Sequence, residues 1–331
     1  MSMTARERAT TPILEQKEDA VEEDLLMVRV AELYYDEAKT QDEIGGLLRI
    51  SRWKVGRLLT QARERGIVRI EIVHPRARRL GLEREIVERY GLADAVVVPA
   101  PEGDEGTLER VAQAAADHLT ALRPVPRTLG VSWGRTLRAV AEALPDGWAS
   151  GVTVVQLNGG VSLNRRSGGA AGLAVTIAQR ASGQVSLLPS PAILERVETK
   201  QAIEADRTVA GILEQAAAAE TFLFTAGPCD ASSAHVENGY LSVEDVEELA
   251  RRGAVGDVLG RYVDAEGNIV DAQLDARTVG VPLDRLRGAT RAIFVTAGPA
   301  KHDIARTVVS SGLCGVLVTD ETTARALLEE Q

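Results

Sequence analysis

The sequence predicts an α/β protein in which a small N-terminal winged helix-turn-helix domain precedes a large Rossmann-like domain with a parallel sheet. Three observations carry this prediction. Near the N-terminus, a basic segment with helical periodicity contains a tight turn, and an alternating strand follows it. From about residue 95, short β-branched runs alternate with Ala-rich helical segments. The 331 residues are enough for two or three domains.

The N-terminal part divides into a tail and a small domain. Residues 1–20 are polar and mixed in charge, so we expect a disordered tail. We expect residues 21–74 to form the helix-turn-helix domain. Within it, residues 67–73 alternate between two faces, which predicts a strand that acts as a small wing.

Local signals mark the helices of this small domain. Thr40 can cap a second helix, and Glu43 stands three residues later, as in a capping box. Ser51 can cap a third helix, and Gly66 is suited to the position just after it. Gly45 falls where the second and third helices must approach closely, which favours a residue without a side chain.

The charge is distributed unevenly. The chain has a formal net charge of −10, yet residues 40–79 carry ten basic and four acidic side chains. This asymmetry has two readings: a segment that meets a polyanion, or a solvated helical face. The start of the third helix is the part that reaches base edges in a major groove. The candidates for this contact are Ser51, Arg52, Trp53, Lys54 and Arg57.

The segment TQDEIGGLLRISRWKVGRLLTQARERGIVRIEI resembles the DNA-binding segment of the SorC family of bacterial sugar-responsive transcription regulators. The resemblance implies binding of a double-stranded DNA operator, and it adds Gln41 and Arg63 to the candidate DNA-binding residues. Three departures stand out. Arg49 replaces the usual turn glycine, Trp53 a frequent proline, and Gly56 a serine within the helix. We therefore expect Arg49 to adopt a positive φ.

Residues 75–94 read as a basic linker followed by an amphipathic helix, and residues 95–331 as the large domain. Strands are expected within residues 94–100, 127–133, 152–160, 184–190, 220–227, 257–263, 291–298 and 315–320. Helices are expected near residues 105–122, 135–144, 168–182, 201–218, 242–252, 300–310 and 320–329.

Candidate ligand-binding residues follow or flank these strands, where open parallel sheets bind ligands. Backbone N–H groups at a helix start suit a phosphate, glycines allow close approach, and a lysine neutralises an anion. The candidates are Ser132, Trp133, Gly134, Arg135, Thr136, Asn158, Gly159, Gly160, Asp257, Gly298 and Lys301. Taken singly, each also fits a plainer role: a connecting turn, an exposed lysine or a capping aspartate.

The large domain also resembles the SorC family, in its effector-binding part. The shared blocks are GVSWGRTL, VVQLNGG, AVGDVLGRYVDAEG and AGPAK. The resemblance implies the fold of sugar-phosphate isomerases, a phosphate held by residues 133–136, and effector contacts from Asp257 and Lys301. Trp133 and Arg135 are bulkier than the residues of some phosphate-binding relatives, which leaves room for an unphosphorylated sugar or polyol.

The predicted function is a DNA-binding regulator, a repressor of a carbohydrate catabolic operon. A sugar phosphate, or a related polyol or sugar, would control its affinity for the operator. The resemblance implies a homotetramer, with a dimer also possible. One alternative is an isomerase-like enzyme, disfavoured because the sequence places no second acid or His near Asp257 and Lys301. Another is a DNA-binding protein whose large domain only oligomerises.

Other classes find no support in the sequence. Cys229 and Cys314 are far apart, and the four histidines fit no metal-ligand spacing, so we expect no metal, no cofactor and a reducing cytoplasm. No apolar run reaches the roughly 20 residues of a membrane helix, and the N-terminus lacks a signal-peptide core. The effector's identity, the operator sequence and the direction of regulation stay open at this point.

Overall fold

The computed structural model of the chain describes residues 11–68, 78–100, 106–160, 169–329. The chain divides into two compact units, Met1–Ile72 and Val73–Gln331. Each unit has hydrophobic clusters of its own, as expected of separate domains.

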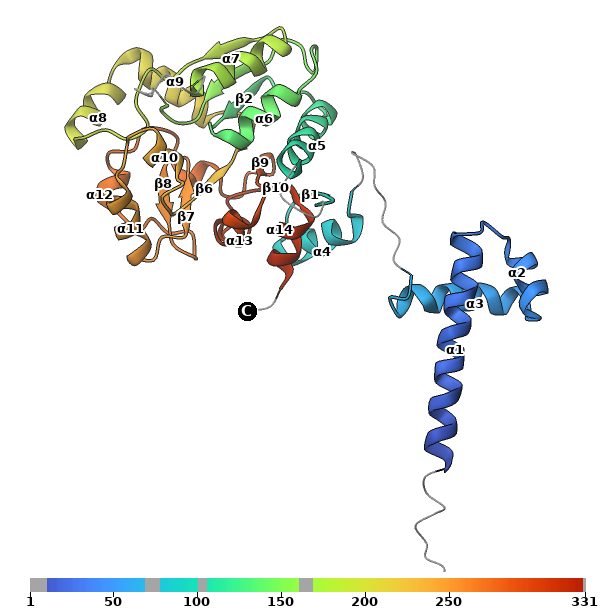
Figure 1. Cartoon of the computed structure of the whole chain (residues 1–331). Helices are drawn as coiled ribbons and strands as arrows, with labels where there is room; N and C mark the ends of the chain where they lie inside the picture. Colours follow the sequence, from blue (N-terminus) through green and yellow to red (C-terminus); the bar gives the residue numbers. More distant parts are fainter. Residues whose placement is uncertain (1–10, 69–77, 101–105, 161–168, 330–331) are drawn as a thin grey trace, which may run out of the picture. The chain divides into compact units, whose positions relative to one another are not determined.

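The first unit contains α1 (Thr11–Tyr35), α2 (Gln41–Leu48) and α3 (Arg52–Glu64), shown in blue in Figure 1. Their shared core consists of Met27, Val30, Leu33, Ile44, Val55, Leu58, Leu59 and Ala62. The expectation of a disordered tail at residues 1–20 is wrong in part, because α1 begins at Thr11 and runs without a break into the residues expected to be helical. Most of the predicted wing strand lies outside the described residues.

The predicted caps are confirmed. The Thr40 hydroxyl accepts a hydrogen bond from the Glu43 N–H at 3.3 Å, and the Glu43 carboxylate accepts one from the Thr40 N–H at 2.8 Å. The Ser51 hydroxyl accepts from the Lys54 N–H at 3.2 Å. Gly66 has φ +74° just after α3. These bonds satisfy helix-end donors and so fix where α2 and α3 begin.

The turn between α2 and α3 is tight and partly strained. A Cβ on Gly45 would lie 2.8 Å from the Ile50 carbonyl oxygen, so no larger residue fits without movement. Arg49 ends α2 with φ +54°, as expected from its replacement of a turn glycine. A non-glycine residue in this left-handed region costs about 1 kcal/mol or more.

The second unit is built around a seven-stranded parallel sheet in the order β1-β10-β9-β5-β2-β3-β4. Its strands are β1 (Asp94–Val98), β2 (Thr128–Val131), β3 (Thr153–Gln156), β4 (Gln184–Ser186), β5 (Thr221–Phe224), β9 (Ala292–Val295) and β10 (Val316–Asp320). The strand order reverses between β2 and β5. Such a switch point opens a crevice at the carboxyl ends of the strands, where α/β proteins bind ligands.

Helices cover both faces of this sheet. One face packs against α4 (Leu80–Tyr90), α9 (Arg207–Ala217), α13 (His302–Ser310) and α14 (Glu321–Leu328). The other packs against α5 (Thr107–Ala121), α6 (Arg135–Ala143) and α7 (Ala170–Arg180). Because both faces are covered, every residue of β5, β9 and β10 is buried, which explains their continuous apolar runs.

A second, antiparallel sheet of β6 (Ala226–Pro228), β7 (Gly256–Val258) and β8 (Arg261–Val263) follows β5. The single strand predicted at residues 257–263 is therefore wrong. Leu259 and Gly260 adopt φ +53° and +84° and turn the chain back on itself, as two-residue hairpins require. The run at residues 220–227 is likewise divided between β5 and β6.

Some helices differ from the prediction. The expected helix at residues 201–218 is two helices, α8 (Val197–Glu204) and α9, because the Asp206 carboxylate accepts from the Thr208 N–H and starts a new helix. The remaining helices are α10 (Ala234–Glu237), α11 (Val243–Arg251), α12 (Ala272–Asp275), η1 (Leu283–Arg285) and η2 (Pro299–Lys301). The sequence did not predict α10 and α12, which are each only four residues long.

Candidate functional site

One face of α3 is buried and the opposite face is exposed. Arg52, Trp53, Arg57 and Arg63 are all exposed, and Trp53 is 89% exposed. A large apolar ring so open to solvent is unusual away from an interaction surface. Arg52, Arg57 and Arg63, three of the basic side chains that the sequence singled out, therefore lie on exposed parts of the helix.

A shallow hollow lies on this free side of α3. Its lining residues are Gln41, Arg52, Trp53, Gly56, Arg57 and Thr60. The hollow joins α2 to α3, so the structure brings four of the predicted DNA-binding side chains together. Arg63 stands in the last turn of α3, beyond this hollow. Ser51 serves as the helix cap, and Lys54 is half-buried.

The Arg52 guanidinium lies 3.3 Å from the Asp42 carboxylate, and both side chains are largely exposed. An ion pair in this setting contributes about 0–1 kcal/mol and is screened by salt. Arg52 can therefore exchange this partner for a phosphate or a base edge at little cost.

A cavity of about 360 Å³ lies at the switch point of the parallel sheet. Nine of the eleven predicted ligand-binding residues line it: Ser132, Trp133, Gly134, Arg135, Thr136, Asn158, Asp257, Gly298 and Lys301. Residues that follow β2, β3 and β5 thus converge on one space with residues of the small antiparallel sheet and η2. Its volume is in the range of small-molecule sites.

Lys301 occupies one end of this cavity. Its Nζ donates to the Thr136 hydroxyl at 3.2 Å and to the Thr225 hydroxyl at 3.3 Å. The pKa of the Lys301 amine is lowered to about 8, chiefly by burial; the Asp257 carboxylate opposes this shift and the Arg135 charge adds to it. This end therefore concentrates positive charge in a place with little solvent.

The N-terminus of α6 faces the same end. Its N-cap residue, Gly134, makes no side-chain cap and has φ +140°. The amides of Arg135 and Thr136 belong to the first turn, where N–H groups have no acceptor within the helix. First-turn amides next to a lysine form an arrangement that suits a phosphate or carboxylate. We call Lys301, Thr136, Thr225 and this first turn the anion end.

Backbone and side-chain hydrogen bonds hold the loop after β2 in place. The Ser132 N–H donates to the Leu223 carbonyl at 3.0 Å, and the Ser132 hydroxyl accepts from the Thr225 N–H at 3.4 Å. The Trp133 indole N–H donates to the Gly159 carbonyl at 2.8 Å. Trp133 therefore forms a fixed wall of the cavity.

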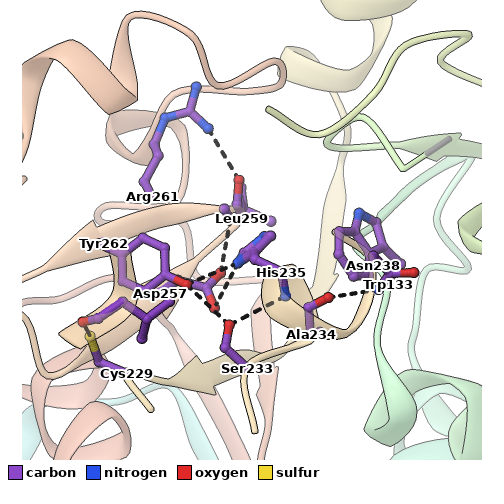
Figure 2. Close-up of polar contacts among 12 residues, drawn as sticks. Trp133, Cys229, Ser233, Ala234, His235, Asn238, Asp257, Leu259, Arg261 and Tyr262 are labelled. Carbon is purple, nitrogen blue, oxygen red and sulfur yellow. Dashed lines mark hydrogen bonds and ion pairs between the residues drawn. The ribbon is translucent and has the colours of Figure 1, made fainter. Parts of the chain in front are cut away.

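Asp257 lies in the cavity wall and is 8% exposed. One of its oxygens accepts from the Gly260 N–H at 3.0 Å, and the other lies 3.8 Å from Nδ1 of His235 (Figure 2). The hairpin β7–β8 positions this carboxylate beside the main sheet. The sequence did not identify His235, because it lies in the short helix α10 within an irregular segment. Thr225 was also missed, although it directly follows β5, where the rule about strand ends applies.

Gly159 and Gly160 do not line this cavity. A Cβ on Gly159 would lie 2.1 Å from the Pro191 carbonyl oxygen, and one on Gly160 would lie 2.3 Å from the Ala170 Cβ. Their N–H groups donate to the carbonyls of Val279 and Ser190. These glycines are required by close packing of the chain, not by the approach of a ligand. Gly298 does line the cavity, but its N–H donates to the Asp320 carboxylate at 3.0 Å.

Within the described residues, no group of three or more His, Cys, Asp or Glu side chains is placed to hold a metal ion. The same residues contain no helix with the length and apolar character needed to cross a membrane. Burial raises the pKa of the Cys229 thiol to about 11 and that of Cys314 to about 12, so neither is an activated nucleophile.

The two units together have the arrangement of a helix-turn-helix protein with a ligand-binding α/β domain. Residues 74–329 match the family model described as a putative sugar-binding domain. The chain is 33% identical to the deoxyribonucleoside regulator of Bacillus subtilis (strain 168) over 310 residues, which are 93% of this chain and 99% of the relative. It is 28% identical to the sorbitol operon regulator of Klebsiella pneumoniae, covering 92% of this chain and 98% of that one.

Solved structures show the same relationship. The full-length sorbitol operon regulator SorC from Klebsiella pneumoniae is 29% identical, covers 92% of this chain and 98% of its own, and superimposes with a TM-score of 0.69. A domain of a possible sugar-binding transcriptional regulator from Arthrobacter aurescens TC1 is 30% identical, with 75% and 96% coverage and a TM-score of 0.65. This chain belongs to the SorC family of sugar-binding transcriptional regulators.

Proposed function

We propose that this transcriptional regulator binds a DNA operator through α3 and that a phosphorylated sugar or polyol in the cavity changes its affinity for that operator. The observation that carries the proposal is the anion end, where Lys301 is held between two threonine hydroxyls. A buried ammonium beside first-turn amides is costly unless a ligand anion makes use of it. The relatives include a sorbitol operon regulator and an erythritol catabolism regulatory protein, and this supports a carbohydrate effector.

The DNA-binding role is assigned to the free side of α3. Arg52, Trp53 and Arg57 would approach base edges, with Gln41 beside them and Arg63 on the phosphate backbone. Ser51 keeps its capping role, and Lys54 supports contacts at the helix start. Removing a phosphate-contacting arginine should reduce the salt slope of binding by about 1, and removing a base-reading one should relax specificity.

Regulation is proposed to act through a homo-oligomer, a tetramer or a dimer, that represses a carbohydrate catabolic operon from the cytoplasm. Two copies of α3 would occupy successive major grooves of a quasi-palindromic operator. The effector shifts DNA affinity only by its differential binding to two arrangements of the subunits. Residues 21–74 would carry DNA binding, residues 75–94 the connection, and residues 95–331 effector binding and oligomerisation.

A second candidate is an isomerase-like enzyme. One reason given against it from the sequence is wrong, because the structure places His235 beside Asp257. A carboxylate, an imidazole and a lysine in one cavity are groups that acid–base chemistry uses. The regulator is nevertheless favoured, because curated relatives that match more than nine-tenths of the chain are named as regulators. Turnover of an aldose phosphate that is lost in Asp257→Asn would support the enzyme.

A thermal-shift screen of the full chain tests the proposal. It compares phosphorylated sugars and polyols with their unphosphorylated counterparts, in pairs. A ligand at 100 times its dissociation constant stabilises by about 2.7 kcal/mol. Stabilisation by only the phosphorylated member of a pair supports phosphate binding at the anion end. Stabilisation by only the free sugar contradicts it. No stabilisation by any member would favour the third reading, a large domain that only oligomerises.

A further inference from the structure

Two further polar side chains, His235 and Asn158, line the same cavity, and we call them its second polar end. We infer that His235 and Asn158 read a hydroxyl group of the bound effector there. The effector would then be a phosphorylated sugar or polyol with a hydroxyl remote from its phosphate, and not simply any small phosphate ester. The inference rests on the proposed function, because it takes the anion end as given.

Asp257 lies between the two ends. The charge of its carboxylate favours the protonated form of Lys301 and so raises the pKa of that amine. Its Oδ1 also lies 3.8 Å from His235 Nδ1. A ligand whose phosphate meets Lys301 therefore extends past Asp257 toward His235. The carboxylate accepts hydrogen bonds and disfavours a second anionic group at this position.

The His235 ring is held in one orientation (Figure 2). Its Nδ1 lies 3.3 Å from the Tyr262 hydroxyl, which in turn lies 3.0 Å from the Ser233 hydroxyl. The Trp133 ring packs edge-on against it at a centroid distance of 5.6 Å. Nδ1 is therefore already used, and Nε2 is the ring nitrogen left to meet a ligand.

Nε2 of His235 has no hydrogen-bond partner among the described residues, and His235 is only 2% exposed. An imidazole nitrogen withdrawn from water normally has a partner. Either tautomer leaves Nε2 able to make one bond, as a donor or as an acceptor. Nε2 is therefore an unfilled hydrogen-bonding position in the wall of the cavity.

Gly260 lies next to Nε2. A Cβ on Gly260 would lie 3.5 Å from His235 Nε2 and 3.2 Å from Thr278 Cγ2, and the second distance is closer than an ordinary van der Waals contact. Gly260 also has φ +84°, a conformation that favours glycine. Gly260 and His235 both line the cavity, so backbone and no side chain of this turn lies beside Nε2.

Asn158 supplies the second unfilled group. It lines the cavity and is 3% exposed, and its Oδ1 has no partner among the described residues. An amide and an imidazole both match a hydroxyl, which donates one hydrogen bond and accepts others. A ligand with an apolar group at this position would leave both His235 and Asn158 unpaired. Such a ligand should bind much more weakly, because unpaired buried polar groups cost free energy.

Two matched variants of the full chain separate contact with the ligand from support of the fold. His235→Gln retains a nitrogen near the Nε2 position, and His235→Asn retains one near the Nδ1 position, where Tyr262 is bonded. The probes are inorganic phosphate, glycerol 3-phosphate, ribose 5-phosphate and glucose 6-phosphate, measured by calorimetry. The quantity compared is the affinity of the tightest ester relative to that of inorganic phosphate.

We expect this ratio to be retained in His235→Gln and to fall about tenfold in His235→Asn, as expected for one lost hydrogen bond. Inorganic phosphate should bind all three proteins equally. An equal fall in both variants would overturn the inference, because the ring would then act only through Tyr262. A wild-type ratio near one would overturn it as well.

Asn158→Leu provides an independent variant if His235→Gln does not fold. It should lower the same ratio and leave the affinity for inorganic phosphate unchanged, and an unchanged ratio would contradict the inference. Failure of the proposed function looks different. In that case the wild-type chain would bind none of the four probes, or Lys301→Met would bind them as tightly as wild type.

Discussion

Replacing Lys301 with methionine should have opposite effects on stability and on ligand binding. Lys301 is half-buried, and the pKa of its amine, about 8 instead of 10.5, means that keeping the amine charged costs free energy in the folded chain. That shift corresponds to about 3 kcal/mol of destabilisation at neutral pH. Methionine is of similar length and carries no charge, so Lys301→Met should leave the free energy of unfolding unchanged or raise it by up to about 3 kcal/mol.

The same substitution should weaken the binding of phosphorylated ligands. It removes the ammonium that lies between Thr136 and Thr225. A hydrogen bond to a charged group contributes about 1.5–3 kcal/mol, so affinity should fall about 10-fold to 150-fold.

Chemical denaturation measures the first effect of Lys301→Met and calorimetry with a phosphorylated sugar the second. Thr225→Val is a control that keeps the charge and removes one hydroxyl, and we expect a smaller loss of affinity from it. A Lys301→Met protein that unfolds more easily and binds phosphorylated ligands normally would refute the assignment, because the lysine would then be structural.

Three further predictions concern pH and the turn of the DNA-binding unit. Affinity for a sugar phosphate should fall by up to about tenfold per pH unit above about 8, because Lys301 then loses its proton; calorimetry from pH 7 to 9 measures this, and an equal slope in Lys301→Met would contradict it. Arg49→Gly should stabilise the first unit by about 1 kcal/mol, since it relieves a residue at φ +54°; a loss of stability in denaturant would show that the arginine side chain matters more. Thr40→Ala should destabilise it by about 1 kcal/mol through loss of the capping box, while Thr40→Ser should be nearly neutral, and equal losses in both would argue against the cap.

Much of the first unit was predictable from local chemistry. Helix caps and turns depend on residues that are neighbours in the sequence. The capping roles of Thr40, Glu43 and Ser51 could therefore be predicted from the sequence. The positive φ of Arg49 also followed from its place in the turn. The parallel strands were recognisable because burial on both faces requires continuous apolar runs.

The parts that were not predicted depend on contacts between distant residues. The run at 257–263 reads as one strand, and only the positive φ of Leu259 and Gly260 divides it. His235 stands in a four-residue helix without periodicity, and its position beside Asp257 depends on the packing of the hairpin. Gly159 and Gly160 looked like ligand-binding glycines, because close approach to a neighbouring chain segment and to a ligand require the same residue.

The most direct test asks whether a ligand that binds the second unit changes the affinity of the chain for DNA. Duplexes are first selected from a random DNA library with the full chain, and the affinity of the best duplex is then measured by fluorescence anisotropy with and without the sugar phosphate that stabilises the protein most. We expect the ligand to change DNA affinity by about 5-fold to 150-fold. Lys301→Met should lose this change and retain DNA binding without the ligand. Stabilisation of the protein by that ligand with no change in DNA affinity, or no duplex selected at all, would contradict it.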